Sequence, residues 1–233
     1  MTELLIKPTG RRAFLGGIGA ASGGLLLAGC TTGLGGFGMV DAVRRLLFLS
    51  SEQAFARLTA PGGYWDDQVA QIGLGNLLGA RGNVLSNILT SALFKSRLER
   101  EFAGFALEAS DRAAPIVLDT VRTIGFQNAI DLVRGGPTAA TAFLRGNMGS
   151  RLIDAMVPEL GQAMRVASDP LVGQALSAVS GVDIGSVATR VANGIDNAIW
   201  GEIGREEAAI RANPQATRDP LLIGVFGAAD RLL

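Results

Sequence analysis

The fold of this chain is decided by residues 183–214, which read DIGSVATRVANGIDNAIWGEIGREEAAIRANP. The large apolar residues of this stretch return with the spacing of one face of an α-helix, and polar residues fill the positions between them. Proline cannot continue a helix, so Pro214 predicts its end. We therefore predict a long amphipathic helix over residues 183–212, with its apolar face at Val187, Val191, Ile195, Ala198 and Ile203.

Apolar residues recur with the same helical spacing through the rest of the chain from residue 39 onwards. Few segments there have the alternating pattern of a strand. One helix is predicted from about residue 96 to residue 112, and another covers residues 152–167. The apolar face of the first is Leu98, Phe102, Phe105 and Ala109, and that of the second is Leu152, Met156, Leu160, Ala163 and Ala167.

Glycine and proline predict where further helices begin and end. A helix that starts near Val40 ends at Pro61-Gly62-Gly63, and Gly125 separates short helices at 115–124 and 127–134. A turn follows at Gly135-Gly136-Pro137. Asp169-Pro170 and Asp219-Pro220 pair a helix-capping residue with a proline at the first helical position. We expect an all-α protein, with a single compact domain of about eight or nine helices over residues 39–233.

The composition excludes several classes of chemistry. Of 233 residues, 48% are hydrophobic and 18% are charged, there is no histidine, and Cys30 is the only cysteine. Without these ligands and bases, ordinary zinc, copper, haem and iron–sulfur sites and histidine-activated nucleophiles are excluded. Carboxylate-bound Mg²⁺ or Ca²⁺ stays open, and we predict no cofactor.

The net charge argues against a nucleic-acid partner. Without residues 1–29, the chain has 18 basic and 20 acidic side chains, a formal charge of −2. Binding to nucleic acid needs a concentrated basic field, so we predict no nucleic-acid partner.

The N-terminus has the layout of an export signal: a charged start, an apolar stretch and small residues before a cleavage point. Within it, Arg11-Arg12-Ala13-Phe14-Leu15 resembles the signal of the twin-arginine route, and a glycine-rich, moderately apolar stretch follows. Signal recognition is therefore assigned to Arg11, Arg12, Phe14 and Leu15. We predict that residues 1–29 are a signal peptide.

A lipid attachment site follows directly. Leu27-Ala28-Gly29-Cys30 resembles the lipobox of bacterial lipoproteins, in which the cysteine sulfur receives a diacylglyceryl group and cleavage occurs just before it. Residues 30–38 then form the lipidated cysteine and a glycine-rich spacer. Thr31, rather than aspartate, after the cysteine favours the outer membrane. The alternative is an uncleaved membrane anchor, but ten of the residues from Ala13 to Val40 are glycine, which makes a poor helix.

Two carboxylate pairs are candidates for acid/base chemistry, since paired carboxylates can share a proton. Asp66-Asp67 is expected in a turn and Glu206-Glu207 on a helix. A solvated face or a helix cap is the competing interpretation of both pairs. Gly73-x-Gly75-x-x-x-Gly79 lacks the spacing of a dinucleotide loop and no strand precedes it, so it is interpreted as an ordinary loop.

A cluster of charges near the C-terminus is a candidate anion site. Arg205, Glu206, Arg211 and Arg218 could together bind a carboxylate or phosphate. Pairing of Glu207 with Arg211 within one helix accounts for some of the same charges.

Four groups of residues in the helical body form recognisable motifs: Pro61-Gly62-Gly63-Tyr64, Ala106 to Pro115, Gly135-Gly136 with Thr138-Ala139-Ala140-Thr141, and the run from Glu206-Glu207 through Ile210-Arg211, Asn213-Pro214 and Leu221-Leu222 to Val225-Phe226-Gly227. Through these motifs, residues 40–227 resemble a bacterial envelope family known as domain of unknown function 4197. Pro137 and Gly73-Leu74-Gly75 depart from the family's pattern. The family has no assigned activity, so the resemblance implies no catalytic residue.

We therefore expect a lipid-anchored envelope protein that faces the periplasm and binds a protein partner or an apolar ligand. The alternative is a carboxylate-dependent envelope hydrolase that uses Glu206 or Asp66.

Overall fold

The computed structural model describes residues 37–60, 63–72, 92–165 and 184–229. In these ranges the chain forms eight α-helices and one short 3-10 helix, with no strand. The predicted all-α class is confirmed. The predicted signal and lipobox, residues 30–36 of the predicted spacer and the glycine loop at residues 73–79 lie outside the described residues. Phe37 and Gly38, expected in the spacer, are instead the first two residues of the helix over residues 37–58.

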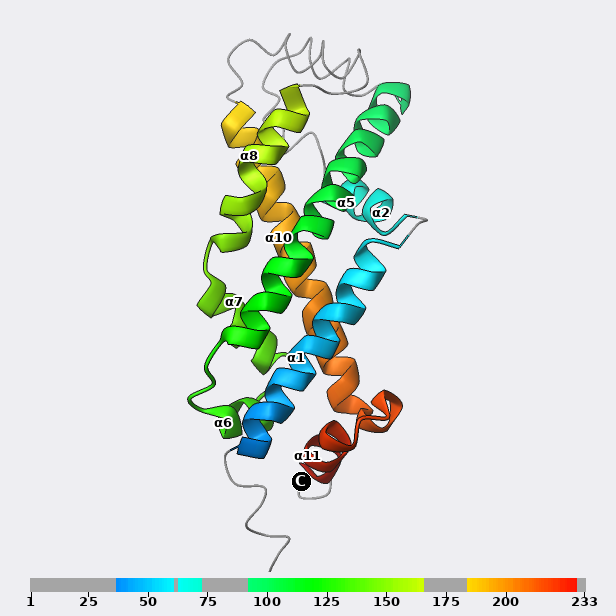
Figure 1. Cartoon of the computed structure of the whole chain (residues 1–233). Coiled ribbons are helices and arrows are strands. Elements are labelled where there is room, and N and C mark those ends of the chain that lie inside the picture. Colours follow the sequence, from blue (N-terminus) through cyan, green and yellow to red (C-terminus); the bar gives the residue numbers. More distant parts are fainter. Residues whose placement is uncertain (1–36, 61–62, 73–91, 166–183, 230–233) are drawn as a thin grey trace, which may run out of the picture.

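Four long helices run side by side and form an elongated bundle (Figure 1). They are α1 (Phe37–Leu58), α5 (Ala92–Thr123), α8 (Arg151–Arg165) and α10 (Ile184–Ala212). α10 packs against both α1 and α8, and α5 packs against α1. The short helix α2 (Tyr64–Ile72) lies on α5. The core consists of apolar side chains between these helices, among them Leu46, Phe102, Leu152, Ile195 and Ile199.

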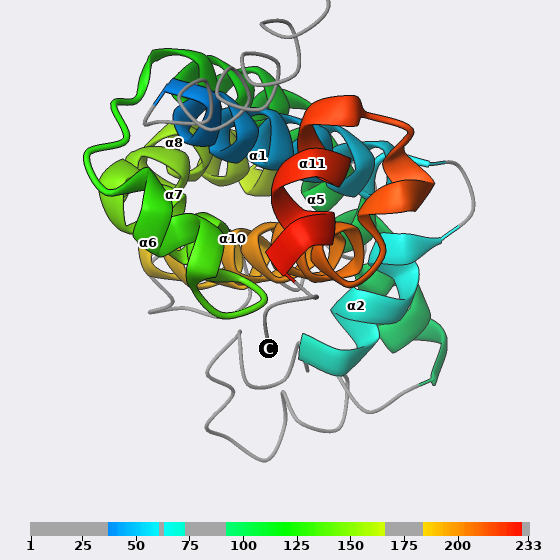
Figure 2. The ribbon, with the colours of Figure 1, turned by 90° about the horizontal axis from the view of Figure 1, so that it is seen from below.

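Three of the remaining elements lie near the end of the bundle where α1 begins: α6 (Ala129–Arg134), the 3-10 helix η1 (Pro214–Thr217) and α11 (Pro220–Ala229) (Figures 1 and 2). The fourth, α7 (Ala139–Met148), lies along the side of the bundle between α6 and α8. α6 and α11 both contact α1. The end of the bundle where α1 begins is therefore closed by short helices.

The predicted helix over residues 183–212 is confirmed, because α10 covers residues 184–212 and ends before Pro214. Asp219 caps α11 as expected: one of its carboxylate oxygens accepts hydrogen bonds from the amides of Leu221 at 3.0 Å and Leu222 at 3.2 Å. The N-terminus of α11 thus has two of its free amides satisfied.

The prediction of separate helices before and after residue 115 is wrong. α5 continues through Pro115 to Thr123. Pro115 is exposed, whereas Ala113, Val117 and Val121 are buried against the bundle. Pro115 has no backbone N–H, so one hydrogen bond of the helix is missing at this point. Packing of the apolar face against the bundle stabilises the helix enough to continue through it.

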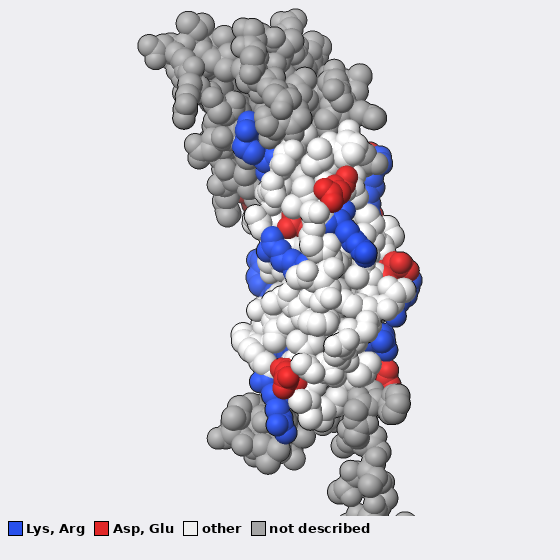
Figure 3. All heavy atoms as spheres, turned by 90° about the vertical axis from the view of Figure 1, so that its left-hand side faces the viewer, with Lys and Arg blue, Asp and Glu red and all other residues white. Residues whose placement is uncertain are grey.

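Among the described residues no helix is long and apolar enough to cross a membrane. On the face shown in Figure 3, arginines and carboxylates are scattered among neutral residues and do not form a single-signed patch.

Candidate functional site

In the described ranges, the buried charged side chains form three groups, and the first joins α10 to α6 and α7. The Glu207 carboxylate is fully buried and accepts hydrogen bonds from the backbone amides of Ala140 at 3.0 Å and Thr141 at 2.7 Å, in the first turn of α7. These amides have no partner within their own helix, and the positive end of the helix dipole favours a negative charge there. Glu207 therefore caps α7 from another helix.

Arg211 completes this group. Its Nε lies 2.7 Å from Glu207 Oε1, and its two terminal nitrogens donate to the carbonyls of Val133 at 3.0 Å and Leu132 at 2.8 Å, in the last turn of α6. The guanidinium also lies 4.9 Å from the centroid of the Phe226 ring of α11. The predicted pairing of Glu207 with Arg211 is confirmed. Of the two interpretations of this carboxylate, a solvated face is wrong, because the pair is buried between α6, α7 and α11, and a helix cap is right, because Glu207 caps α7.

Two glycines allow the close approach of these helices. A Cβ on Gly135 would lie 2.6 Å from Ala139 Cβ and 2.9 Å from the Asp131 carbonyl oxygen, and one on Gly204 would lie 3.2 Å from Thr138 Cγ2. Five of the residues that carry the family resemblance thus meet in one place: Gly135, Ala140, Thr141, Glu207 and Arg211. They connect helices and leave no charge available for a ligand.

The second group joins the last turn of α1 to α10. Arg57 bridges two buried carboxylates: its Nη1 lies 3.1 Å from Glu202 Oε1 and its Nη2 lies 2.7 Å from Glu206 Oε1. Arg205 also pairs with Glu202 and donates a 3.1 Å hydrogen bond to the Tyr64 hydroxyl of α2. The group has two positive and two negative charges, so it neutralises itself. The expected solvated face is wrong for Glu206 too.

Burial raises the pKa of the Tyr64 hydroxyl, and the negative charge of Glu202 raises it further, while Arg205 acts in the opposite direction. Tyr64 therefore stays protonated at neutral pH and serves as a hydrogen-bonding contact between α2 and α10.

The third group was not found by sequence reasoning. Asp196 on α10 accepts a hydrogen bond from Trp200 Nε1 at 2.9 Å and lies 2.8 Å from Arg145 Nη2 of α7. Burial raises the pKa of Asp196, although Arg145 and the Trp200 bond both lower it. The spacing from Asp196 to Trp200 is one helical turn and is visible in the sequence, whereas the contact with Arg145 depends on how α7 packs.

The predicted anion site is not assembled. Arg205 turns to Glu202 and Tyr64, Glu206 pairs with Arg57, and Arg211 lies against α6. Arg218 is exposed at the end of η1, with a left-handed backbone conformation. These side chains do not converge. In the described part of the chain, no three carboxylate or thiol groups cluster as metal ligands would.

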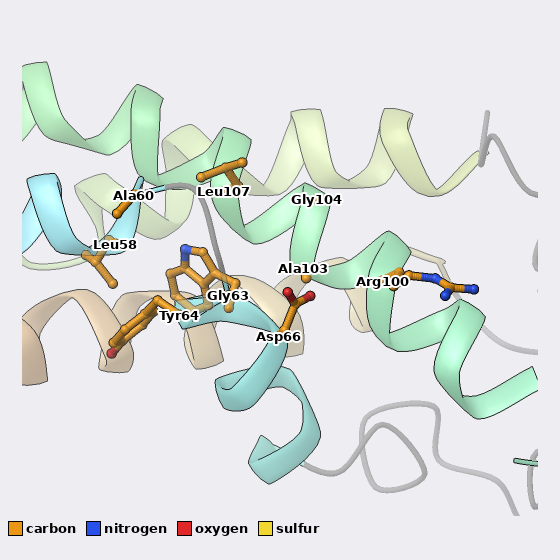
Figure 4. Close-up of a pocket in the computed structure, with 10 residues that line it drawn as sticks. Leu58, Ala60, Gly63, Tyr64, Asp66, Arg100, Ala103, Gly104 and Leu107 are labelled. Carbon is orange, nitrogen blue, oxygen red and sulfur yellow. The ribbon is translucent and has the colours of Figure 1, made fainter.

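A pocket of about 200 Å³ lies where α1, α2 and α5 meet, and Gly63 and Tyr64 form part of its wall (Figure 4). Its walls are mostly apolar, and Asp66 and Arg100 are the charged residues that line it. The lining residues are Leu58, Ala60, Gly63, Tyr64, Trp65, Asp66, Arg100, Ala103, Gly104 and Leu107. Asp66 and Asp67 were expected in a turn, but they occupy the first turn of α2, where both are exposed.

One polar atom of this pocket has no partner. Trp65 is only 3% exposed, and its Nε1 is buried with no hydrogen-bond acceptor in the described parts of the chain. The ring is held edge-on against Tyr64, with 5.3 Å between the centroids. A buried indole N–H normally finds a partner, so this donor is an unusual feature of the pocket wall.

Comparison with known proteins extends over nearly the whole helical body. Residues 34–227 match the model of a family described as "Protein of unknown function (DUF4197)", a match that begins before α1 and ends within α11. No curated protein and no solved structure matches the chain.

Proposed function

The chain belongs to the DUF4197 family, and from that premise we propose that it is a lipid-anchored protein of the bacterial envelope that acts by binding a protein partner. The anchor rests on the order of its signals. Arg11-Arg12 with Phe14-Leu15, then an apolar stretch, then Leu27-Ala28-Gly29-Cys30 form one continuous export and lipidation sequence. Lipidated Cys30 would hold the domain on the periplasmic face of a membrane, which we take to be the outer one.

Binding is favoured over catalysis because the buried carboxylates of α10 are occupied by structural ion pairs. Glu202, Glu206 and Glu207 all lie in ion pairs that connect helices. Asp66 lines the pocket, but Glu206, the other carboxylate considered for a hydrolase, does not. A single exposed carboxylate does not make an acid/base pair.

The observation that carries the binding proposal is the unpaired N–H of Trp65 in an apolar wall. A pocket of about 200 Å³ is smaller than the usual small-molecule site of roughly 300–1,000 Å³. It suits one or two side chains of a partner protein, in the way that interfaces place an anchor residue in a small desolvated pocket. Trp65 Nε1 is itself buried, so it would pair with an acceptor on that anchor once the indole ring turns towards the pocket.

Fractionation of cells tests the anchor. Cys30→Ala should move the protein from the membrane to the soluble envelope fraction, and Arg11→Lys with Arg12→Lys should leave it in the cytoplasm. Membrane association of the Cys30→Ala protein equal to that of the wild type would refute the tether.

Site-specific photo-crosslinking in the same cells tests the pocket. A benzoylphenylalanine at Leu107, which lines the pocket and is 39% exposed, should give one discrete protein adduct. The adduct should weaken when Trp65→Phe removes the N–H and keeps an aromatic ring. Glu108, the exposed neighbour outside the pocket lining, is the control position. An adduct at Leu107 that Trp65→Phe does not change would contradict the proposed site.

A further inference from the structure

The last helix, α11, has no polar face. It reads PLLIGVFGAA and contains no charged residue. Leu222 and Phe226 are buried against the bundle, while Leu221, Ile223 and Val225 are half-buried and Gly224 is exposed. A helix on the surface of a globular protein ordinarily presents charged or polar residues outward. The outer side of α11 is instead apolar or small, which suits contact with an apolar medium.

Other apolar side chains lie at the same end of the bundle. Ile130 of α6 is 45% exposed, and Met39 and Val40 in the first turns of α1 are half-buried. Figure 2 views this end and shows α6, α11 and the start of α1 together. We call the surface made by Met39, Val40, Ile130, Leu221, Ile223, Gly224 and Val225 the apolar end.

The chain connects the apolar end to the proposed anchor. α1 begins at Phe37, seven residues after Cys30. Even fully extended, seven residues reach at most about 25 Å. A lipid on Cys30 would therefore bring the apolar end, and not the opposite end of the bundle, to the bilayer.

We propose that the apolar end docks on the surface of the bilayer, with α11 in the headgroup region. This inference rests on the lipid anchor proposed above. The tether makes docking an intramolecular event, so a modest apolar contact is sufficient to hold it. Among the described residues, the charged side chains near this end are Asp41, Asp131 and Asp219 with Arg44, Arg45, Arg134 and Arg218, which leaves a formal charge of only +1. Docking is therefore driven by apolar burial and depends little on salt.

Docking also sets the orientation of the pocket. Leu58, at the last residue of α1, lines the pocket, and α1 is about 32 Å long at 1.5 Å per residue. A domain that stands on its apolar end holds the pocket away from the membrane, open to a partner in the periplasm.

A fluorescent label on α11 tests the docking. Cys30 is the only cysteine, and lipidation consumes its thiol, so an introduced cysteine is the only one that reacts. Gly224→Cys is suitable because a Cβ there meets nothing within 4 Å. Ala56→Cys, at an exposed position near the far end of α1, is the matched control. Both full-length lipoproteins would be labelled with a nitrobenzoxadiazole dye and reconstituted in vesicles of phosphatidylethanolamine and phosphatidylglycerol.

Docking predicts that the label at position 224 is quenched by nitroxide-labelled lipids and that its iodide quenching constant is about threefold lower than at position 56, because the headgroup boundary excludes the ion. Adding Ile223→Asp to Gly224→Cys should restore iodide quenching while the protein still floats with the vesicles.

Three outcomes would overturn the proposal, and they differ in what else they affect. Flotation with full iodide access at position 224 rejects docking and leaves the anchor intact. Protection from iodide without nitroxide quenching means that a second copy or another protein covers α11. A protein that does not float and reacts with the dye at Cys30 rejects the anchor together with the docking.

Discussion

Glu207 and Arg211 form a buried ion pair that holds three helices in place, with 2.7 Å between Glu207 Oε1 and Arg211 Nε. Glu207 satisfies the free amides at the start of α7, and Arg211 satisfies the free carbonyls at the end of α6. This one pair thus caps two opposite helix ends. The negative charge of Glu207 lies at the N-terminus of α7 and the positive charge of Arg211 at the C-terminus of α6, and the helix dipole favours each charge there.

Glu207→Gln should destabilise the protein by about 3 kcal/mol, because it leaves Arg211 buried without its counter-charge. Arg211→Met should cost a similar amount, and the double variant should lose less than the sum of the two, since each residue loses the same partner. Urea denaturation followed by circular dichroism measures all three free energies of unfolding.

The matched control is Glu108→Gln on α5. Glu108 pairs with Arg112 at the same four-residue spacing and at 2.6 Å, but their side chains are 59% and 50% exposed. An exposed pair of this kind contributes roughly 0.5 kcal/mol. Equal losses for Glu207→Gln and Glu108→Gln would show that burial of the first pair has no energetic consequence.

Gly135→Ala should cost about 1–3 kcal/mol, because the added methyl would overlap Ala139 and the Asp131 carbonyl where α6 approaches α7. The backbone of Gly135 has φ −67°, which any residue can adopt, so the cost comes from space alone. Gly136→Ala is the control, since a Cβ there meets nothing within 4 Å. Thermal unfolding compares the two, and a Gly135→Ala variant as stable as Gly136→Ala contradicts the close approach.

The two tryptophans should respond differently to replacement by phenylalanine. Trp65 Nε1 has no partner among the described residues, whereas Trp200 Nε1 donates to buried Asp196. Trp200→Phe should therefore cost about 1–2 kcal/mol more than Trp65→Phe and should raise the pKa of Asp196 further. Both substitutions replace a buried indole ring by the smaller phenyl ring. The difference between the two losses in the free energy of unfolding therefore measures the hydrogen bond from Trp200 to Asp196. Similar losses in urea denaturation would mean that Trp65 Nε1 already has an acceptor in the folded protein.

Asp219 should stabilise the protein in a pH-dependent manner. The hydrogen bond from Arg45, at 2.7 Å, and those from the Leu222 and Leu221 amides hold the pKa of this carboxyl below its usual value of 3.8, although burial acts in the opposite direction. A lowered pKa in the folded state means that the ionised form stabilises the fold above pH 4 or so and that this contribution disappears as the pH falls further.

Asp219→Asn keeps an oxygen for the cap and removes the charge, so it isolates that contribution. The difference in the free energy of unfolding between wild type and Asp219→Asn, about 1 kcal/mol at pH 7, should shrink towards zero below about pH 3. A difference that grows on acidification would contradict the sign of the pKa shift.

Sequence reasoning succeeded where the decisive interactions are local. The length of α10, its end before Pro214 and the cap of α11 by Asp219 all depend on residues within a few positions of one another. The pairing of Glu207 with Arg211 was predictable for the same reason. The interruption at Pro115 was predicted wrongly, because the propensity of one residue was outweighed by the packing of α5 along the bundle.

The candidate site was largely beyond such reasoning. The carboxylates at 206 and 207 were expected on a solvated face or as a cap, and their burial follows only from contacts with Arg57 and with the first turn of α7, each far away in the chain. The pocket likewise combines α1, α2 and α5. Its unpaired Trp65 N–H has no signature in the pattern of residues.

Periodic apolar residues and the turns between them were sufficient to establish the all-α class, because helix formation is read from neighbouring residues. Tertiary packing alone decided which charges are buried and which helices they connect. It also decided that α11 turns an apolar side outward at the end nearest the proposed anchor. Those properties depend on which distant segments meet, and one-dimensional spacing does not contain that information.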